Sequence, residues 1–148
     1  MELKPSGRTV VDPVGLVRQY VKRDANGERM ETNAWFQSVV TWPDEPGYDS
    51  HTVIRAFTVV PPKTIAGSPA KIAVRYDVMG WVVASAFIPQ EKIEAFEFEV
   101  AQTDEGWRIQ APQIDQHILP EIAAAMALLT PEDAARIREL AAQPPAEP

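Results

Sequence analysis

The chain has 148 residues, no cysteine and a formal net charge of −7, with 45% hydrophobic and 24% charged residues. These values are typical of one soluble domain, which at this length buries about 68–70% of the surface of its unfolded chain. The acidic balance argues against nucleic-acid and anionic-membrane partners, which need a concentrated basic surface, and the lack of cysteine excludes disulfides, thiol catalysis and cysteine-based zinc sites.

Two helices are predicted at the start of the chain, after an irregular arm over residues 1–11. Asp12-Pro13 is typical of a helix N-cap followed by the first helical position. Valines then recur at helical spacing until Asn26-Gly27, which is typical of a helix end. A second helix is predicted from Asn33 to Val40, before the loop TWPDEPGYDS at 41–50.

Strand-like alternation replaces the helical spacing from His51 onward. It predicts a strand over 51–60, an antiparallel partner over 70–80 and a further short strand within 81–89. In the second of these, Ile72, Val74, Tyr76 and Val78 share one face, and Lys71, Ala73, Arg75, Asp77 and Met79 share the other.

Both faces of the predicted strand 51–60 are apolar. One face carries Val53, Phe57 and Val59 with Arg55, and the other carries Ile54, Ala56, Thr58 and Val60. A sheet that is apolar on both sides needs cover on both sides. The N-terminal helices are expected to cover one side. The other is covered either by the C-terminal helices or by a second copy of the chain, in a homodimer through the outer sheet face.

A hairpin is predicted in IEAFEFEVAQTDEGWRIQAPQI, residues 93–114. Pairing Val100 with Trp107 leaves a four-residue loop from Gln102 to Glu105, a common length. This register sets Phe98 opposite Ile109, Phe96 opposite Ala111, and Glu99 opposite Arg108. Apolar side chains then face one another across the strands, and opposite charges meet on the other face.

The helical period returns in an appendix over residues 115–142, followed by a frayed tail at 143–148. One helix is predicted from Pro120 to Leu129, and Thr130 with Pro131 is typical of the start of another. Grouped helices and grouped strands indicate an α+β fold. We expect one domain over 12–142, with a core over 12–114 in which two N-terminal helices pack in a curved, mostly antiparallel sheet of four to six strands.

Three sequence segments carry a resemblance to a known superfamily: W..EPGYDS (42–50), VRYDVMG (74–80) and GWRIQAP…HI (106–118). Together with the helix-then-sheet order over 12–114, they resemble the nuclear transport factor 2-like superfamily, the cone shared by ketosteroid isomerase and SnoaL-like proteins. The segments themselves resemble bacterial proteins of that type, many of which carry leader peptides. The resemblance implies a cone with a ligand site in its interior, and often a dimer through the outer face.

The inward-facing side chains of such a cone form the predicted pocket: Tyr20, Trp35, Phe36, Ile54, Tyr76, Phe96, Phe98, Trp107 and Ile109. These side chains either fill one another's space as a core or leave an apolar pocket for a small hydrophobic molecule. In the second case the hydroxyl groups of Tyr20 and Tyr76 are its best polar groups.

Acid–base catalysis in this superfamily uses an Asp, His or Tyr inside the cone, which makes Tyr76 and Asp77 the weak catalytic candidates here. Neighbours in a strand face opposite sides, so only one of the two can point inward unless a bulge intervenes. The alternation favours a surface ion pair between Asp77 and Arg75. We therefore expect a non-catalytic ligand-binding or protein-interaction module. The alternative is a SnoaL-like lyase, isomerase or hydrolase acting on a small hydrophobic substrate.

No metal or cofactor is expected. The two histidines, His51 and His117, lack a second ligand at helical or strand spacing, and Asp49-Ser50-His51 is more typical of a turn than of a catalytic triad. Asp115 and His117 are expected to be capping and surface groups. The glycines are isolated, so no phosphate-binding loop is predicted.

The sequence as given predicts a cytoplasmic protein. No apolar segment is long enough to span a bilayer, and the start, MELKPSGRTVVDP, lacks a signal-peptide hydrophobic region. A periplasmic or secreted protein is expected instead if Met1 replaces a removed leader.

Overall fold

The computed structural model describes residues 12–31, 34–45, 47–63 and 69–143. The predicted N-terminal arm and all but the first residue of the predicted C-terminal tail lie outside these residues. So does Asn33, the predicted first residue of the second helix.

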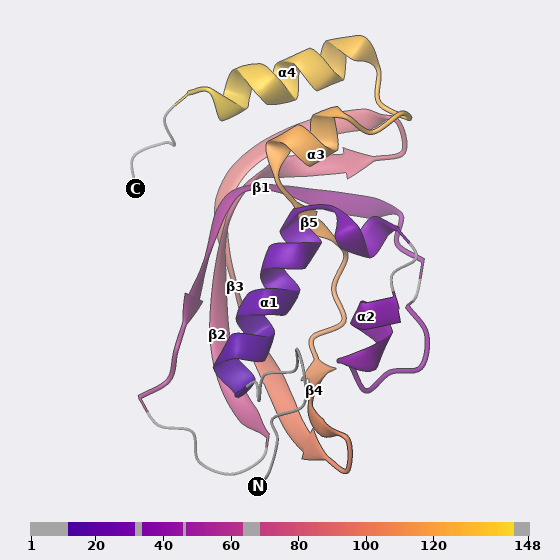
Figure 1. Ribbon diagram of the computed structural model, residues 1–148. Helices are drawn as coiled ribbons and strands as arrows, with labels where there is room; N and C mark the ends of the chain where they lie inside the picture. Colours follow the sequence, from indigo (N-terminus) through magenta and orange to yellow (C-terminus); the bar gives the residue numbers. More distant parts are fainter. Residues whose placement is uncertain (1–11, 32–33, 46, 64–68, 144–148) are drawn as a thin grey trace, which may run out of the picture.

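The described residues form an α+β fold with a curved, five-stranded half-barrel sheet (Figure 1). The strands are β1 (Ser50–Val60), β2 (Ala70–Val83), β3 (Ala86–Thr103), β4 (Gly106–Ala111) and β5 (His117–Ile118), in the spatial order β4-β3-β2-β1-β5. The helices are α1 (Pro13–Ala25), the short 3₁₀ helix η1 (Glu28–Met30), α2 (Ala34–Ser38), α3 (Pro120–Ala124) and α4 (Pro131–Ala141). All strand pairs are antiparallel except β1 with β5.

Helix α1 begins and ends where its sequence predicts. The side chain of Asp12 accepts a hydrogen bond from the backbone N–H of Gly15 at 2.7 Å, and Pro13 occupies the first turn, where its missing N–H is not needed. Gly27 follows the helix with a φ of +85°, a backbone conformation that glycine adopts without strain. Val17 and Val21 lie on the buried face of α1, which packs against the sheet (Figure 1).

Two β-bulges change which side of the sheet the apolar residues reach. Arg55 is the extra residue in β1, where Ile54 pairs with Val78 and Ala56 with Asp77; Met79 is the extra residue in β2. Ile54 faces the inner core on the α1 side, but so do Phe57 and Val59, which simple alternation assigns to the opposite face. The two predicted face sets of this strand are therefore wrong beyond Arg55.

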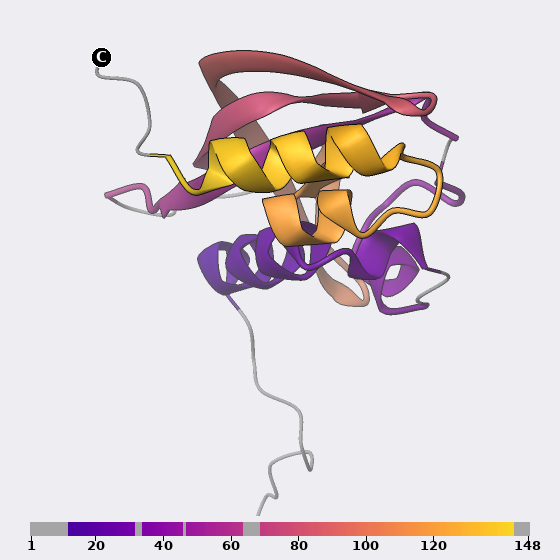
Figure 2. The same cartoon turned by 90° about the horizontal axis from the view of Figure 1, so that it is seen from above.

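A second core lies under the C-terminal helices. There Val53, Met79, Val82 and Phe87 from the sheet pack with residues of α3 and α4, among them Ala134 and Ile137. Figure 2 shows α3 and α4 side by side next to the β2–β3 hairpin. Of the two alternatives for covering this part of the sheet, the chain's own helices are the one observed.

Helix α4 is held at both ends. At its start, the Thr130 side chain accepts a hydrogen bond from the N–H of Asp133 at 3.1 Å, as predicted, and Asp133 in turn accepts one from the N–H of Phe87 at 3.0 Å. At its end, Nη1 of Arg55 donates to the carbonyl groups of Leu140 at 2.8 Å and Gln143 at 3.2 Å. The bulge residue of β1 thus binds the last turn of α4.

The β3–β4 hairpin confirms the predicted faces but not the predicted register. Thr103 pairs with Gly106 and Val100 with Ile109, so the loop has two residues rather than four. The turn is closed by the Thr103 hydroxyl, which donates to the carbonyl of Gly106 at 2.7 Å and accepts from the N–H of Glu105 at 3.1 Å. Since the error between Val100 and the turn is an even number of residues, Val100 and Ile109 are buried as expected. A register shift then pairs Ala111 with Glu99, so the predicted pairs Phe96–Ala111 and Glu99–Arg108 do not form.

The remaining differences concern element lengths. Residues 81–89 do not form a separate strand, because β2 continues to Val83 and turns through Ala84-Ser85 into β3. Helix α2 ends at Ser38, and Val40 instead forms a bridge with Ile109. Helix α3 ends at Ala124 rather than at Leu129.

Gly80 marks a place where the β2–β3 hairpin leaves no room for a side chain. A Cβ atom there would lie 2.7 Å from the ring of Phe87 and closer still to the carbonyl oxygen of Ile88, a backbone atom. We expect Gly80→Ala to lower the free energy of unfolding by about 1–3 kcal/mol, as measured by urea denaturation, because the strands must separate to admit it.

Gly47→Ala is the matched control, since a Cβ atom at Gly47 meets nothing within 4 Å. It should change the free energy of unfolding by no more than about 0.5 kcal/mol. If Gly80→Ala and the parent protein unfold at the same urea concentration, the close approach of β2 and β3 at Gly80 is contradicted.

Candidate functional site

The residues predicted to line an interior pocket lie in or against the inner core. Tyr20, Phe36, Ile54, Tyr76, Phe98 and Ile109 are buried, and Trp35, Phe96 and Trp107 pack against them partly buried. Their rings contact one another: the centroid of Tyr20 lies 5.4 Å from that of Phe36 and 6.2 Å from that of Phe98. These side chains therefore fill each other's space across the interface of α1, α2 and the sheet.

The two catalytic candidates lie on opposite faces of β2. Tyr76 is 1% exposed, and burial raises its pKa well above its usual range, which keeps the phenol protonated. Asp77 points outward, and its carboxylate lies 3.9 Å from the guanidinium of Arg75, which confirms the predicted surface ion pair. Neither residue lines the pocket described below.

A buried ion pair that was not predicted joins α1 to η1. Asp24 is 2% exposed, and the Arg29 side chain is 1% exposed. Nη1 of Arg29 donates to the Asp24 carboxylate at 3.4 Å. Nε and Nη2 donate to the Glu45 carboxylate, at 3.1 and 2.9 Å. Nη2 also donates to the carbonyl of Ile114. Every nitrogen of this guanidinium therefore has a protein acceptor.

His117 is the largest correction to the predicted site, because it is 1% exposed rather than a surface group. Its Nδ1 lies 2.8 Å from the carbonyl oxygen of Asp115, and its Nε2 lies 3.1 Å from the carboxylate of Glu94. Both ring nitrogens of His117 therefore face oxygen atoms of the protein. The hydrogen bond from His117 lowers the pKa of Glu94.

The prediction that Asp115 is a capping group on the surface is also wrong. Its carboxylate is partly buried and accepts a hydrogen bond from the Thr52 hydroxyl at 2.9 Å. This contact lies beside the pairing of Thr52 with His117 in β1 and β5. Asp115 therefore helps to hold the segment before β5 against the sheet.

Asp24 connects Arg29 with His117. Its Oδ2 atom accepts both from Arg29 and from the backbone N–H of His117, the latter at 3.2 Å. Burial raises the pKa of Asp24 to about 6, although Arg29 and the hydrogen bond from His117 both act to lower it. The carboxylate is therefore mostly ionised at neutral pH, at a cost in free energy.

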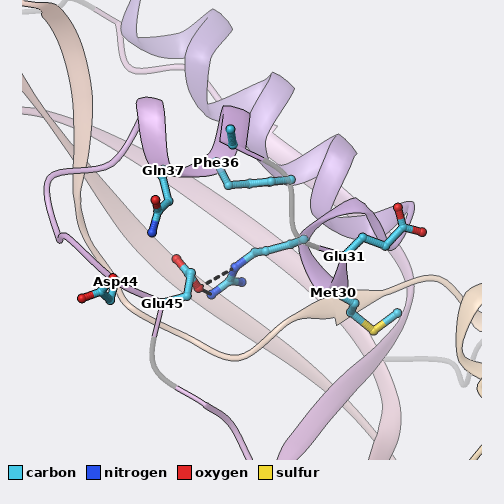
Figure 3. A pocket seen from close by; sticks show the side chains of 8 residues that line it. Met30, Glu31, Phe36, Gln37, Asp44 and Glu45 are labelled. Atoms are coloured by element: carbon cyan, nitrogen blue, oxygen red, sulfur yellow. Dashed lines mark hydrogen bonds and ion pairs between the residues drawn. The ribbon is translucent and has the colours of Figure 1, made fainter.

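A pocket of about 510 Å³ opens where this network reaches the surface between η1, α2 and the loop at 44–45 (Figure 3). It is lined by Arg29, Met30, Glu31, Ala34, Phe36, Gln37, Asp44 and Glu45. The wall is held in place by its hydrogen bonds: Nε1 of Trp42 donates to Glu45 at 2.7 Å, and the amide of Gln37 donates to the carbonyl of Pro43 at 2.9 Å. Of the predicted pocket residues, Phe36 lines this pocket.

The other candidate groups stay apart from the pocket. Ser50 and His51 are the first residues of β1 and Asp49 precedes them, so the three are sequence neighbours at a strand start. Among the described residues, no three His, Asp or Glu side chains are grouped so that they could hold a metal ion. No helix within the described ranges is long and apolar enough to cross a bilayer.

Comparison with protein-family models, with curated proteins and with solved structures finds no match of this chain in any of the three.

Proposed function

We propose that this protein is a non-catalytic module that binds a small molecule in the pocket between η1, α2 and the loop at 44–45. The observation that carries the proposal is the pocket itself, whose volume of about 510 Å³ falls in the range typical of small-molecule sites, roughly 300–1,000 Å³. Its wall combines the buried ring of Phe36 with polar groups that the protein already holds in position.

Preorganisation supports ligand binding at this pocket. Arg29 and Glu45 are fixed by Asp24, Trp42 and the carbonyl of Ile114, so a ligand does not have to order them. Side chains that are already ordered reduce the entropy lost on binding. Membership of the nuclear transport factor 2-like superfamily fits the helices and curved sheet, with the site at the edge of the cone rather than inside it.

Acid–base catalysis has weaker support. Tyr76 is buried with a raised pKa, and Asp77 faces outward beside Arg75. The His117 side chain is likewise buried and already in contact with the carboxylate of Glu94. A proton-transfer group has to reach a substrate, and none of these side chains lines the pocket. A homodimer through the outer sheet face stays a prediction.

A fragment screen followed by NMR on the isotope-labelled protein tests the proposal. Ligands should shift the backbone amide signals of Met30, Phe36 and Glu45. Ala34→Trp should abolish these shifts, because Ala34 is an exposed residue of the pocket wall and the indole fills the pocket. The matched control is Ala135→Trp, on an exposed position of α4, which should leave the shifts unchanged.

The proposal fails if no fragment shifts these signals. It fails equally if ligands bind Ala34→Trp as tightly as they bind the parent protein.

A further inference from the structure

The charges around the pocket do not balance. One guanidinium, that of Arg29, lies among the carboxylates of Glu31, Asp44 and Glu45, all in the pocket wall, with Asp24 behind it. Arg29 is already paired with Asp24 and Glu45. Among the described residues, neither Glu31 nor Asp44 is in an ion pair, and both are exposed. The potential in the pocket is therefore negative.

Arg29 does not make the pocket an anion site. Its side chain is 1% exposed, and each of its nitrogens already donates to a protein oxygen, so the guanidinium is buried behind its own partners and is not presented to a phosphate or carboxylate in the pocket. An anion entering the pocket would also approach the carboxylates of Glu45 and Asp44. The formal net charge of the chain, −7, opposes its approach from a distance.

The acidic groups are spread around an apolar surface. In Figure 3, Asp44 and Glu31 lie on opposite sides of the pocket, with Glu45 between them and Phe36 above. Met30 and Ala34 add further apolar wall. No group of three carboxylates in the described residues is arranged to hold a metal ion. An organic molecule can contact the apolar wall and a carboxylate at the same time.

We propose that the pocket binds an organic cation, an ammonium group carried on a small apolar body. This inference rests on the proposed function of the pocket and names the ligand class for it. The apolar body packs against Phe36 and Met30, while the ammonium group lies toward Asp44 or Glu31. The apolar wall gives affinity for the body of the ligand, and the carboxylates select its charge.

Three probes of one shape and different charge test the inference: benzylammonium, benzyl alcohol and benzoate. Their dissociation constants are measured at the pocket by NMR titration at neutral pH and low salt. Benzylammonium should bind at least about fivefold more tightly than benzyl alcohol, the effect of one close charge pair in water, and benzoate should bind most weakly. Added salt should reduce the preference, since Asp44 and Glu31 are exposed.

Two conservative variants locate the charge selection. Asp44→Asn and Glu31→Gln should each weaken benzylammonium binding, by about fivefold for the carboxylate nearer the ammonium group, and leave benzyl alcohol binding unchanged. Glu139→Gln makes the same change of charge on an exposed position of α4 and should alter neither constant. Each substituted side chain is exposed, so the variants should fold like the parent.

The outcomes separate the inference from the function. If benzyl alcohol or benzoate binds the pocket as tightly as benzylammonium, or if benzylammonium does not bind, the ligand class is wrong. The same conclusion follows if Asp44→Asn and Glu31→Gln both leave the charge preference intact. The pocket remains a binding site in these cases as long as the fragment screen finds a ligand that Ala34→Trp excludes.

Discussion

Arg29→Ala is expected to lower the free energy of unfolding by about 3–5 kcal/mol, the usual cost of removing one partner from a buried ion pair. The substitution leaves the carboxylate of Asp24 buried without its cation and removes both hydrogen bonds to Glu45. It also leaves the carbonyl of Ile114 without its side-chain donor. Urea denaturation at neutral pH measures the loss.

Two further variants make this result interpretable. Arg29→Lys keeps the positive charge, but an ammonium group cannot replace the planar fork that reaches both carboxylates, so its loss should be intermediate. Arg136→Ala removes an exposed arginine from α4 and should change stability by no more than about 0.5 kcal/mol. A loss below about 1 kcal/mol for Arg29→Ala, the value for an exposed pair, would contradict the burial of this network.

Asp24→Asn should change how stability depends on pH. Burial raises the pKa of Asp24 from its ordinary value of 3.8 to about 6, so between these values the folded protein holds the proton more tightly than the unfolded chain does. The contribution of Asp24 to stability is therefore complete below about pH 3.8 and is lost as the pH rises through about 6. The shift corresponds to roughly 3 kcal/mol.

Asparagine does not titrate, so the variant lacks this pH-dependent loss. The stability of the parent protein minus that of Asp24→Asn should fall by roughly 2 kcal/mol between about pH 4 and about pH 7, most of the full shift. Urea denaturation of both proteins across this range measures the difference. Asp104→Asn, at an exposed residue of the β3–β4 loop, is the control and should show no such trend. A difference that rises with pH would mean that pairing with Arg29 outweighs burial.

The helix starts could be predicted from the sequence because capping is a local interaction. Asp12 bonds the N–H of Gly15, and Thr130 bonds that of Asp133, each three residues away. The faces of the β3–β4 hairpin were predicted for a similar reason, since alternation along a strand depends on neighbouring residues. The two-residue turn was not predicted, because it depends on the two hydrogen bonds of the Thr103 hydroxyl, which stabilise it over a longer loop.

Bulges and the buried charges depend on contacts that alternation does not describe. The extra residues Arg55 and Met79 are defined only by the pairing of β1 with β2. His117 bonds Glu94 on β3 and Asp24 on α1, which are remote in sequence. One sign of the network was present in the sequence: Asp24 lies four residues after Tyr20 and seven after Val17, on the helix face that is otherwise apolar.

Arg55 links the register of β1 and β2 to the position of the last turn of α4. It is the residue that β1 has in excess over β2, and its guanidinium reaches the last carbonyl groups of α4. If the two strands were to pair without that offset, Arg55 would enter the ladder and α4 would lose these hydrogen bonds at its C-terminal end. The C-terminal end of α4 is therefore coupled to the alignment of the central strands, and amide-exchange protection in its last turn should report whether β1 and β2 have paired in the native register.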